Sequence, residues 1–203
     1  MKILCIGRNY KEHVRELNSP LPSEPVFFLK PETSLLTGDK PFELPAFSEM
    51  VHYEVELVIR ISKTGKNIPE KEAAGYYDAI TVGLDFTARD IQEQCKKKGL
   101  PWLISKGFDQ SAPLAEFVPK NRFPDTRSIG FHLDLNGKTV QRATSAEMIF
   151  SFETVISYIS RFITLQPGDV IYTGTPSGVG PVKSGDLLEA YLGNNKLLTC
   201  PIK

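Results

Sequence analysis

The sequence predicts an α+β fold rich in β-strands. Short apolar runs bounded by Gly, Pro and Asn recur along most of the chain, whereas few segments show the 3.6-residue periodicity of a helix. A chain of 203 residues can bury one sizeable core. We therefore expect residues 1–203 to form a single domain.

The N-terminal half is predicted to alternate strands, turns and short helices. Asn9 to Leu17 has a helical pattern, with apolar residues on one side, and Pro69 with the charged residues after it marks a helix start. Gly99 and Pro101 end a polar, helix-prone segment that begins at Thr87. Apolar runs predict strands at 1–7, 26–29, 51–61 and 79–84, and prolines, serines and turn residues predict loops at 18–25 and 31–45.

The C-terminal half contains the strongest hairpin signal. Asn136-Gly137 lies between alternating residues of 129–140, as in a two-residue turn with positive φ. Phe152, Val155, Ile156 and Ile159 share one helical face. Turn residues then precede predicted strands at 170–172 and 187–192.

Composition excludes several classes of partner. Lys plus Arg equals Asp plus Glu at 24 each, so neither a nucleic acid nor a membrane surface is an expected partner. No apolar run reaches the length of a membrane span, and the N-terminus lacks a signal-peptide pattern. Cys5, Cys95 and Cys200 are odd in number and widely spaced, which favours neither a disulfide framework nor a zinc site. These features predict a cytoplasmic protein.

The run 51–61, VHYEVELVIRI, places two carboxylates on one face of a strand. Glu54 and Glu56 are two residues apart, so they start roughly 7 Å apart and point the same way. Both could bind one hard cation. A half-exposed strand with solvated glutamates has the same alternation and is the alternative interpretation.

Asp85 follows the predicted strand that ends at Leu84 and could supply a third carboxylate. Taken alone, an Asp in this position is usually a turn or N-cap residue. Three carboxylates together would favour an octahedral, all-oxygen ion such as Mg²⁺ or Mn²⁺. The three histidines are scattered and offer no competing site for a softer metal.

His13 and Glu16 form a second candidate pair. They lie three residues apart on a predicted helix, so the carboxylate could orient the imidazole. Residues 10–25, the helix with its proline-rich loop, are a candidate lid over a site. A solvated helix with an incidental histidine is the alternative.

Other polar residues are suggestive only in this context. Lys106 lies in a glycine-containing loop, and Arg89 and Gln92 share a helix face. Arg8 could clamp a carboxylate or lie on the surface. Residues 174–180, GTPSGVG, lack the Gly-Lys-Ser/Thr ending of a phosphate loop, and a tight loop that brings Thr175 and backbone N–H groups to a ligand is the better interpretation.

Four blocks in order, HYEVELVIRI, GLDFTARDIQ, GLPWLISKGFD and YTGTPSGVGPVKSGD, resemble the fumarylacetoacetate hydrolase superfamily. GRNYKEHVREL ahead of them resembles its acylpyruvate hydrolase and oxaloacetate decarboxylase branch. The resemblance implies a multi-layer mixed β roll with peripheral helices, like the C-terminal domain of fumarylacetoacetase, and a homodimer.

The resemblance also implies roles for the candidate residues. The metal ligands for Mg²⁺ or Mn²⁺ fall on Glu54, Glu56 and Asp85. The lid pair falls on His13 and Glu16. The active-site lysine falls on Lys106, and substrate contacts fall on Arg89, Gln92, Lys106 and Thr175.

The implied activity is cleavage of the C3–C4 bond of a small 2-oxo acid. Acylpyruvate hydrolysis and oxaloacetate decarboxylation would both pass through a metal-bound pyruvate enolate. His13 would serve as general base and Lys106 as a positive charge near the enolate. An isomerase or hydratase of unsaturated 2-oxo diacids and a non-catalytic, cation-binding dimeric module are the alternatives.

Overall fold

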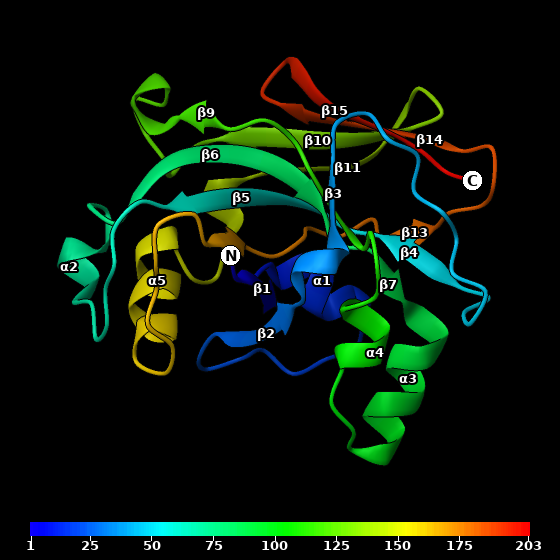
Figure 1. The fold of residues 1–203 in the computed structure, drawn as a ribbon, viewed down its shortest axis with the longest axis horizontal. Coiled ribbons are helices and arrows are strands. Elements are labelled where there is room, and N and C mark those ends of the chain that lie inside the picture. The colour runs from blue at the N-terminus through cyan, green and yellow to red at the C-terminus, as the bar shows by residue number, and fades with distance from the viewer.

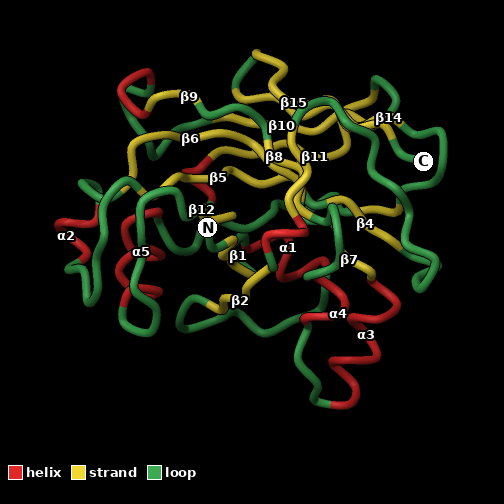
Figure 2. Tube along the Cα trace, in the orientation of Figure 1, coloured by secondary structure: helices red, strands yellow, loops and turns green.

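The computed structural model describes residues 1–203, with strands throughout and few helices (Figures 1 and 2). The strands are β1 (Ile3–Gly7), β2 (Val26–Lys30), β3 (Leu35–Thr37), β4 (Val51–Tyr53), β5 (Val55–Ile61), β6 (Tyr77–Leu84), β7 (Thr87–Ala88), β8 (Ala112–Leu114), β9 (Val118–Pro119), β10 (Gly130–Leu135), β11 (Lys138–Thr144), β12 (Val170–Tyr172), β13 (Gly180–Pro181), β14 (Leu187–Leu192) and β15 (Asn195–Pro201). The helices are α1 (Lys11–Glu16), α2 (Glu70–Ala73), α3 (Arg89–Lys98), α4 (Leu103–Lys106) and α5 (Phe152–Ser160).

Three sheets make up the fold. The largest has eight strands in the order β2-β1-β12-β5-β6-β8-β3, with β9 beside β6. A four-stranded sheet, β11-β10-β14-β15, lies over the curved β5 and β6, and a three-stranded sheet is formed by β13-β4-β7 (Figure 1). Helices α2 and α5 lie at one end and α3 and α4 at the other. This confirms the predicted β-rich α+β fold.

The apolar core occupies both faces of β5. One large buried cluster includes Leu57 and Ile59 of this strand, and a smaller one includes Val58. Because both faces of β5 are buried, the side of the strand that carries the glutamate does not face solvent. The solvated-strand interpretation of Glu54 and Glu56 is therefore wrong, since their exposed fractions are 4% and 1%.

The run 51–61 is divided between two sheets. Residues before Glu54 form β4, which pairs with β7 and β13, and residues after it form β5, which pairs with β6 and β12. Glu54 itself is the junction. A sequence that alternates without interruption gives no sign of this change of sheet, because the change depends on which strands lie alongside.

The hairpin and the helix after Pro69 form as predicted, whereas the helix expected from Thr87 begins at Arg89 because Thr87 and Ala88 form β7. Asn136 and Gly137 have φ angles of 53° and 78°, as a two-residue turn of this class requires, and Gly99 ends α3 with φ of 66°. The segment 31–45 differs from the prediction, because it contains β3. Lys106 also differs, since it ends the short helix α4 rather than lying in a loop.

No helix has the length and apolar character that crossing a membrane would require. The three cysteines are separate, buried and free. Burial raises the pKa of Cys200 to about 12. Burial, with the negative charge of Asp85, also raises the pKa of Cys5 well above its usual value.

These two thiols make the fold sensitive to alkaline pH. Above a pH of about 8.5 the unfolded chain loses the thiol protons and the folded chain keeps them. The free energy of unfolding should therefore fall as pH rises, with a slope for each thiol that approaches about 1.4 kcal/mol per pH unit once the pH is well above 8.5. Urea unfolding between pH 8 and 9.5 measures this slope. The variant Cys200→Ala should lack the contribution of that thiol to the slope. An unchanged slope in that variant would contradict the assignment.

Candidate metal centre and active site

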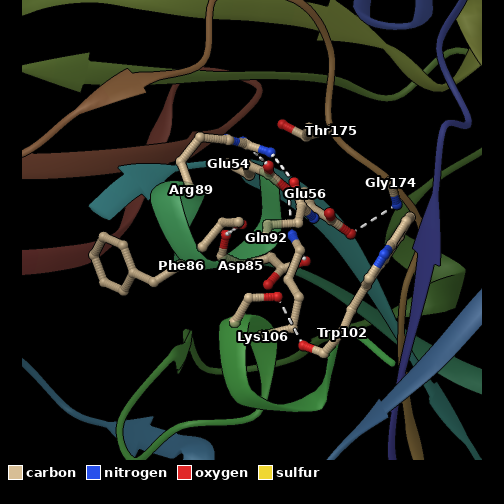
Figure 3. Close-up of polar contacts among 12 residues, drawn as sticks. Glu54, Glu56, Asp85, Phe86, Arg89, Gln92, Trp102, Lys106, Gly174 and Thr175 are labelled. Carbon is tan, nitrogen blue, oxygen red and sulfur yellow. Dashed lines mark hydrogen bonds and ion pairs between the residues drawn. The ribbon is translucent and has the colours of Figure 1, made fainter. Parts of the chain in front are cut away.

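Three buried carboxylates meet where β5 and β6 lie side by side. Antiparallel pairing sets Val55 opposite Leu84, and the Asp85 amide donates a hydrogen bond of 2.8 Å to the Glu54 carbonyl. Glu54, Glu56 and Asp85 can each place one oxygen within 4.8 Å of the others (Figure 3). Two adjacent strand ends therefore build the cluster that the sequence predicted.

Two cations neutralise part of this cluster. Lys106 Nζ lies 2.8 Å from Glu54 Oε2 and 2.7 Å from Asp85 Oδ2, so the ammonium bridges two carboxylates. Arg89 pairs with the other oxygen of Glu54 and donates a hydrogen bond of 2.7 Å to Gln92 Oε1. Burial disfavours the charged form of Glu54, but Lys106 and Arg89 outweigh it and hold the pKa of Glu54 well below its usual range.

Glu56 has no cationic partner. Its Oε2 accepts a hydrogen bond of 2.7 Å from the Gly174 amide, and its side chain makes no ion pair. Burial and the negative charges of Asp85 and Glu54 raise the pKa of Glu56 well above its usual value. A cation beside Glu56 would relieve this repulsion, so the donor set fits a hard divalent ion such as Mg²⁺ or Mn²⁺.

Lys30 is a buried residue that the sequence analysis missed. Its ammonium lies 2.8 Å from Asp85 Oδ1, but its protons are directed to Ser111 and to the carbonyls of Phe86 and Lys106. Asp85 Oδ1 thus contacts the Lys30 ammonium but receives no aligned hydrogen bond. The sequence did contain a signal for it. Lys30 ends the apolar run VFFLK, and a lysine is seldom buried unless it is paired.

The loop 173–178 closes another side of the site. Gly174 has φ of 101°, and a Cβ there would lie 2.6 Å from Asn9 Cβ, so only glycine fits. The Thr175 hydroxyl donates to the Val55 carbonyl and accepts from Gln141 Nε2, each at 2.9 Å. Gln141, which the sequence analysis also missed, therefore orients Thr175.

The predicted lid pair is formed. His13 Nδ1 lies 2.9 Å from Glu16 Oε2, and Glu16 Oε1 accepts a hydrogen bond of 2.9 Å from the Gly178 amide. Burial opposes ionisation of Glu16, yet the hydrogen bonds from His13 and Gly178 lower its pKa. Glu16 thus joins α1 to the loop that also carries Thr175.

One pocket collects nearly all the predicted residues. It is lined by His13, Glu54, Glu56, Asp85, Arg89, Gln92, Lys106 and Thr175, and Glu16 reaches it through His13. Arg8, Lys96 and Trp102 also line it. Its free space is only about 30 Å³, so a substrate needs movement of a wall or of the bridging Lys106.

The fold and this acidic pocket define one class of protein. The chain belongs to the fumarylacetoacetate (FAA) hydrolase C-terminal family, whose sequence pattern it matches over residues 2–202. This confirms the resemblance predicted from the four sequence blocks.

Three individual relatives show how similar the chain is to known proteins of this family. The chain is 48% identical over 188 residues to mitochondrial oxaloacetate tautomerase FAHD1 of Mus musculus, covering 93% of this chain and 85% of that protein. It is 46% identical to mitochondrial oxaloacetate decarboxylase of Dictyostelium discoideum, covering 93% and 87%. The structure of fumarylpyruvate hydrolase from Pseudomonas aeruginosa with Mn²⁺ and pyruvate superposes with a TM-score of 0.94 at 35% identity, covering 100% and 89%.

The carboxylate cluster predicts specific losses of metal binding. Glu56→Gln and Asp85→Asn each remove a negative ligand, so the affinity for Mn²⁺ measured by calorimetry should fall at least about tenfold. Glu93→Gln, an exposed carboxylate on α3, is the matched control and should leave the affinity unchanged. Equal affinities in all three variants would show that the ion binds elsewhere.

Lys30 is predicted to be important for stability. Lys30→Met leaves Asp85 and three backbone carbonyls without their buried cation, which should lower the free energy of unfolding by about 3–5 kcal/mol. Urea denaturation tests this, with the exposed Lys66→Met as control. A loss below about 1 kcal/mol would mean that the ammonium makes no net contribution.

Proposed function

We propose that this protein is a divalent-metal-dependent enzyme that acts on small 2-oxo acids. Hydrolysis of an acylpyruvate and decarboxylation or tautomerisation of oxaloacetate are the reactions that its site supports. The observation that carries the proposal is the buried group of Glu54, Glu56 and Asp85, in one pocket with Lys106 and His13. The mouse, Dictyostelium and Pseudomonas relatives, an oxaloacetate tautomerase, an oxaloacetate decarboxylase and a fumarylpyruvate hydrolase, support the same substrate class.

The three reactions share one electronic requirement. In each of them negative charge develops on C3 of the substrate, and this charge delocalises to the C2 oxygen as an enolate. A divalent ion held by Glu54, Glu56 and Asp85 would polarise the 2-oxo group as a Lewis acid. Lys106 and Arg89 line the same pocket and present fixed positive charge to the developing enolate.

His13 has the arrangement of a general base. The Glu16 carboxylate can only accept at Nδ1, so it favours the tautomer with the proton on Nδ1 and leaves Nε2 free to accept a proton. In acylpyruvate hydrolysis, Nε2 takes a proton from water as the water oxygen adds to C4. The C3–C4 bond then breaks, its electron pair remains on C3, and return of a proton to C3 gives pyruvate and the free acid.

Oxaloacetate needs no attacking water. C4 leaves as CO₂ and the electron pair of the C3–C4 bond remains on C3. Addition of a proton to C3 then gives pyruvate. Tautomerisation only moves a proton between C3 and the C2 oxygen, and His13 can accept it at Nε2. One set of residues therefore suffices for all three reactions.

The lid pair predicts a difference between two substrates. His13→Ala and Glu16→Gln should lower kcat for acetylpyruvate by about 10²-fold or more, because water is no longer deprotonated. Oxaloacetate decarboxylation should fall far less, since it needs no general base. Glu12→Gln, on the exposed side of the same helix, is the control. Equal effects on both reactions would contradict the role of the pair.

Turnover also separates an enzyme from the cation-binding module considered as the alternative. Pyruvate release from acetylpyruvate or oxaloacetate, stopped by EDTA and restored by Mg²⁺, would support the proposal. Tight Mg²⁺ binding without turnover of any 2-oxo acid would favour the module.

A further inference from the structure

A fully buried asparagine, Asn9, lies between the lid helix and the carboxylate cluster and takes no part in the steps of the proposed reaction. Its side chain and backbone are 0% exposed. It follows β1 and precedes α1, which begins two residues later at Lys11 and carries His13. A buried amide is costly unless its polar atoms are paired, so the partners of Asn9 show which segments it holds together.

The side-chain amide of Asn9 uses both of its protons. Nδ2 donates to the Thr173 carbonyl at 2.8 Å and to the Phe150 carbonyl at 3.0 Å, and Oδ1 accepts from the Phe150 amide at 2.7 Å. Rotation of the amide by 180° would place its oxygen against two carbonyl oxygens. Only one orientation of the Asn9 amide therefore satisfies its neighbours.

The hydrogen bond to Thr173 reaches a candidate metal ligand. The Thr173 carbonyl and the Gly174 N–H belong to one peptide unit, and this N–H donates to Glu56 Oε2 at 2.7 Å. The peptide thus accepts a hydrogen bond from Asn9 at its oxygen and donates one to Glu56 at its nitrogen. Hydrogen bonds in such a chain polarise and strengthen one another. Asn9 therefore both orients and strengthens the hydrogen bond that Glu56 receives.

The backbone on either side of this asparagine fixes the start of the lid helix. The Asn9 carbonyl accepts a hydrogen bond of 2.8 Å from the Ile149 amide, and Tyr10 forms a β-bridge with Met148. The chain is thus held at two consecutive residues immediately before the helix that carries His13. A shift at Asn9 would move the helix relative to the carboxylates.

We infer that Asn9 is a positioning residue for the reaction. It holds the 173–174 peptide in the orientation that serves Glu56, and it keeps the entry to the lid helix, and with it His13, at a fixed place relative to the carboxylates. The part that concerns His13 rests on the proposed function. The part that concerns Glu56 is a matter of ion binding and does not depend on turnover.

The affinity for Mn²⁺ tests the path through Glu56. Asn9→Leu keeps the branched shape of the side chain, adds no charge and removes its three hydrogen bonds, so the affinity measured by calorimetry should fall at least about threefold. A glutamine at position 56 cannot offer one oxygen to the Gly174 amide and a second to the ion. In a Glu56→Gln background, Asn9→Leu should therefore change the affinity less than about twofold. If the Leu variant does not fold, Asn9→Ala should give the same pattern.

The ratio of kcat for acetylpyruvate to kcat for oxaloacetate tests the path through His13. At saturating Mg²⁺, Asn9→Leu should lower this ratio at least about threefold, because only the hydrolysis needs the general base. Combined with Glu16→Gln, it should lower the ratio no further than Glu16→Gln alone. Ser160→Ala, which removes a fully buried and hydrogen-bonded hydroxyl of α5, is the control. It should lower the free energy of unfolding in urea and leave the ratio and the Mn²⁺ affinity unchanged.

The outcomes are distinguishable. If Asn9→Leu only lowers stability, as Ser160→Ala does, Asn9 is an ordinary core residue and the inference is wrong, while the proposed function stands. An undiminished effect on Mn²⁺ affinity in the Glu56→Gln background would show that Asn9 does not act through Glu56. An unchanged kcat ratio would overturn the part that concerns the lid helix. If the wild type turns over neither substrate, the proposed function fails, and the affinity measurements still decide whether Asn9 positions Glu56.

Discussion

The site depends on holding three carboxylates out of water with one oxygen of each within 4.8 Å of the others. Like charges at this separation repel strongly where the dielectric constant is low, so the fold must supply compensation. Lys106 and Arg89 compensate the negative charge of Glu54, and Lys30 compensates that of Asp85. Glu56 is the carboxylate left with only a backbone amide. Glu56 is therefore the one carboxylate of the three without a compensating charge, which a divalent ion would supply.

The surrounding structure makes that arrangement rigid. Gly174 brings its amide to Glu56 only because it lacks a Cβ and has positive φ. Gln141 connects β11 to β5, to the Thr175 hydroxyl and to the Pro176 carbonyl through three hydrogen bonds. Groups that have little room to move need little reorganisation when charge develops on a substrate.

Sequence reasoning predicted the fold class and the main residues because their signals are local. The hairpin at Asn136-Gly137, the helix 152–160 and the pair Glu54 and Glu56 each lie within a few residues. The family resemblance then assigned Asp85 and Lys106, whose proximity depends on strand pairing. Lys30 and Gln141 were missed because their roles arise from contacts with residues 34 to 86 positions away. Helix α4 is too short for periodicity to reveal.

The position of Glu54 between two sheets has a consequence for how this family can diversify. The three carboxylates are held by paired strands in the middle of the molecule. Arg8, Lys96 and Trp102 line the same pocket but come from segments outside those strands. Changes in these outer segments can alter what lies against the substrate's tail without disturbing the carboxylates. New specificities can thus evolve on an unchanged reaction centre.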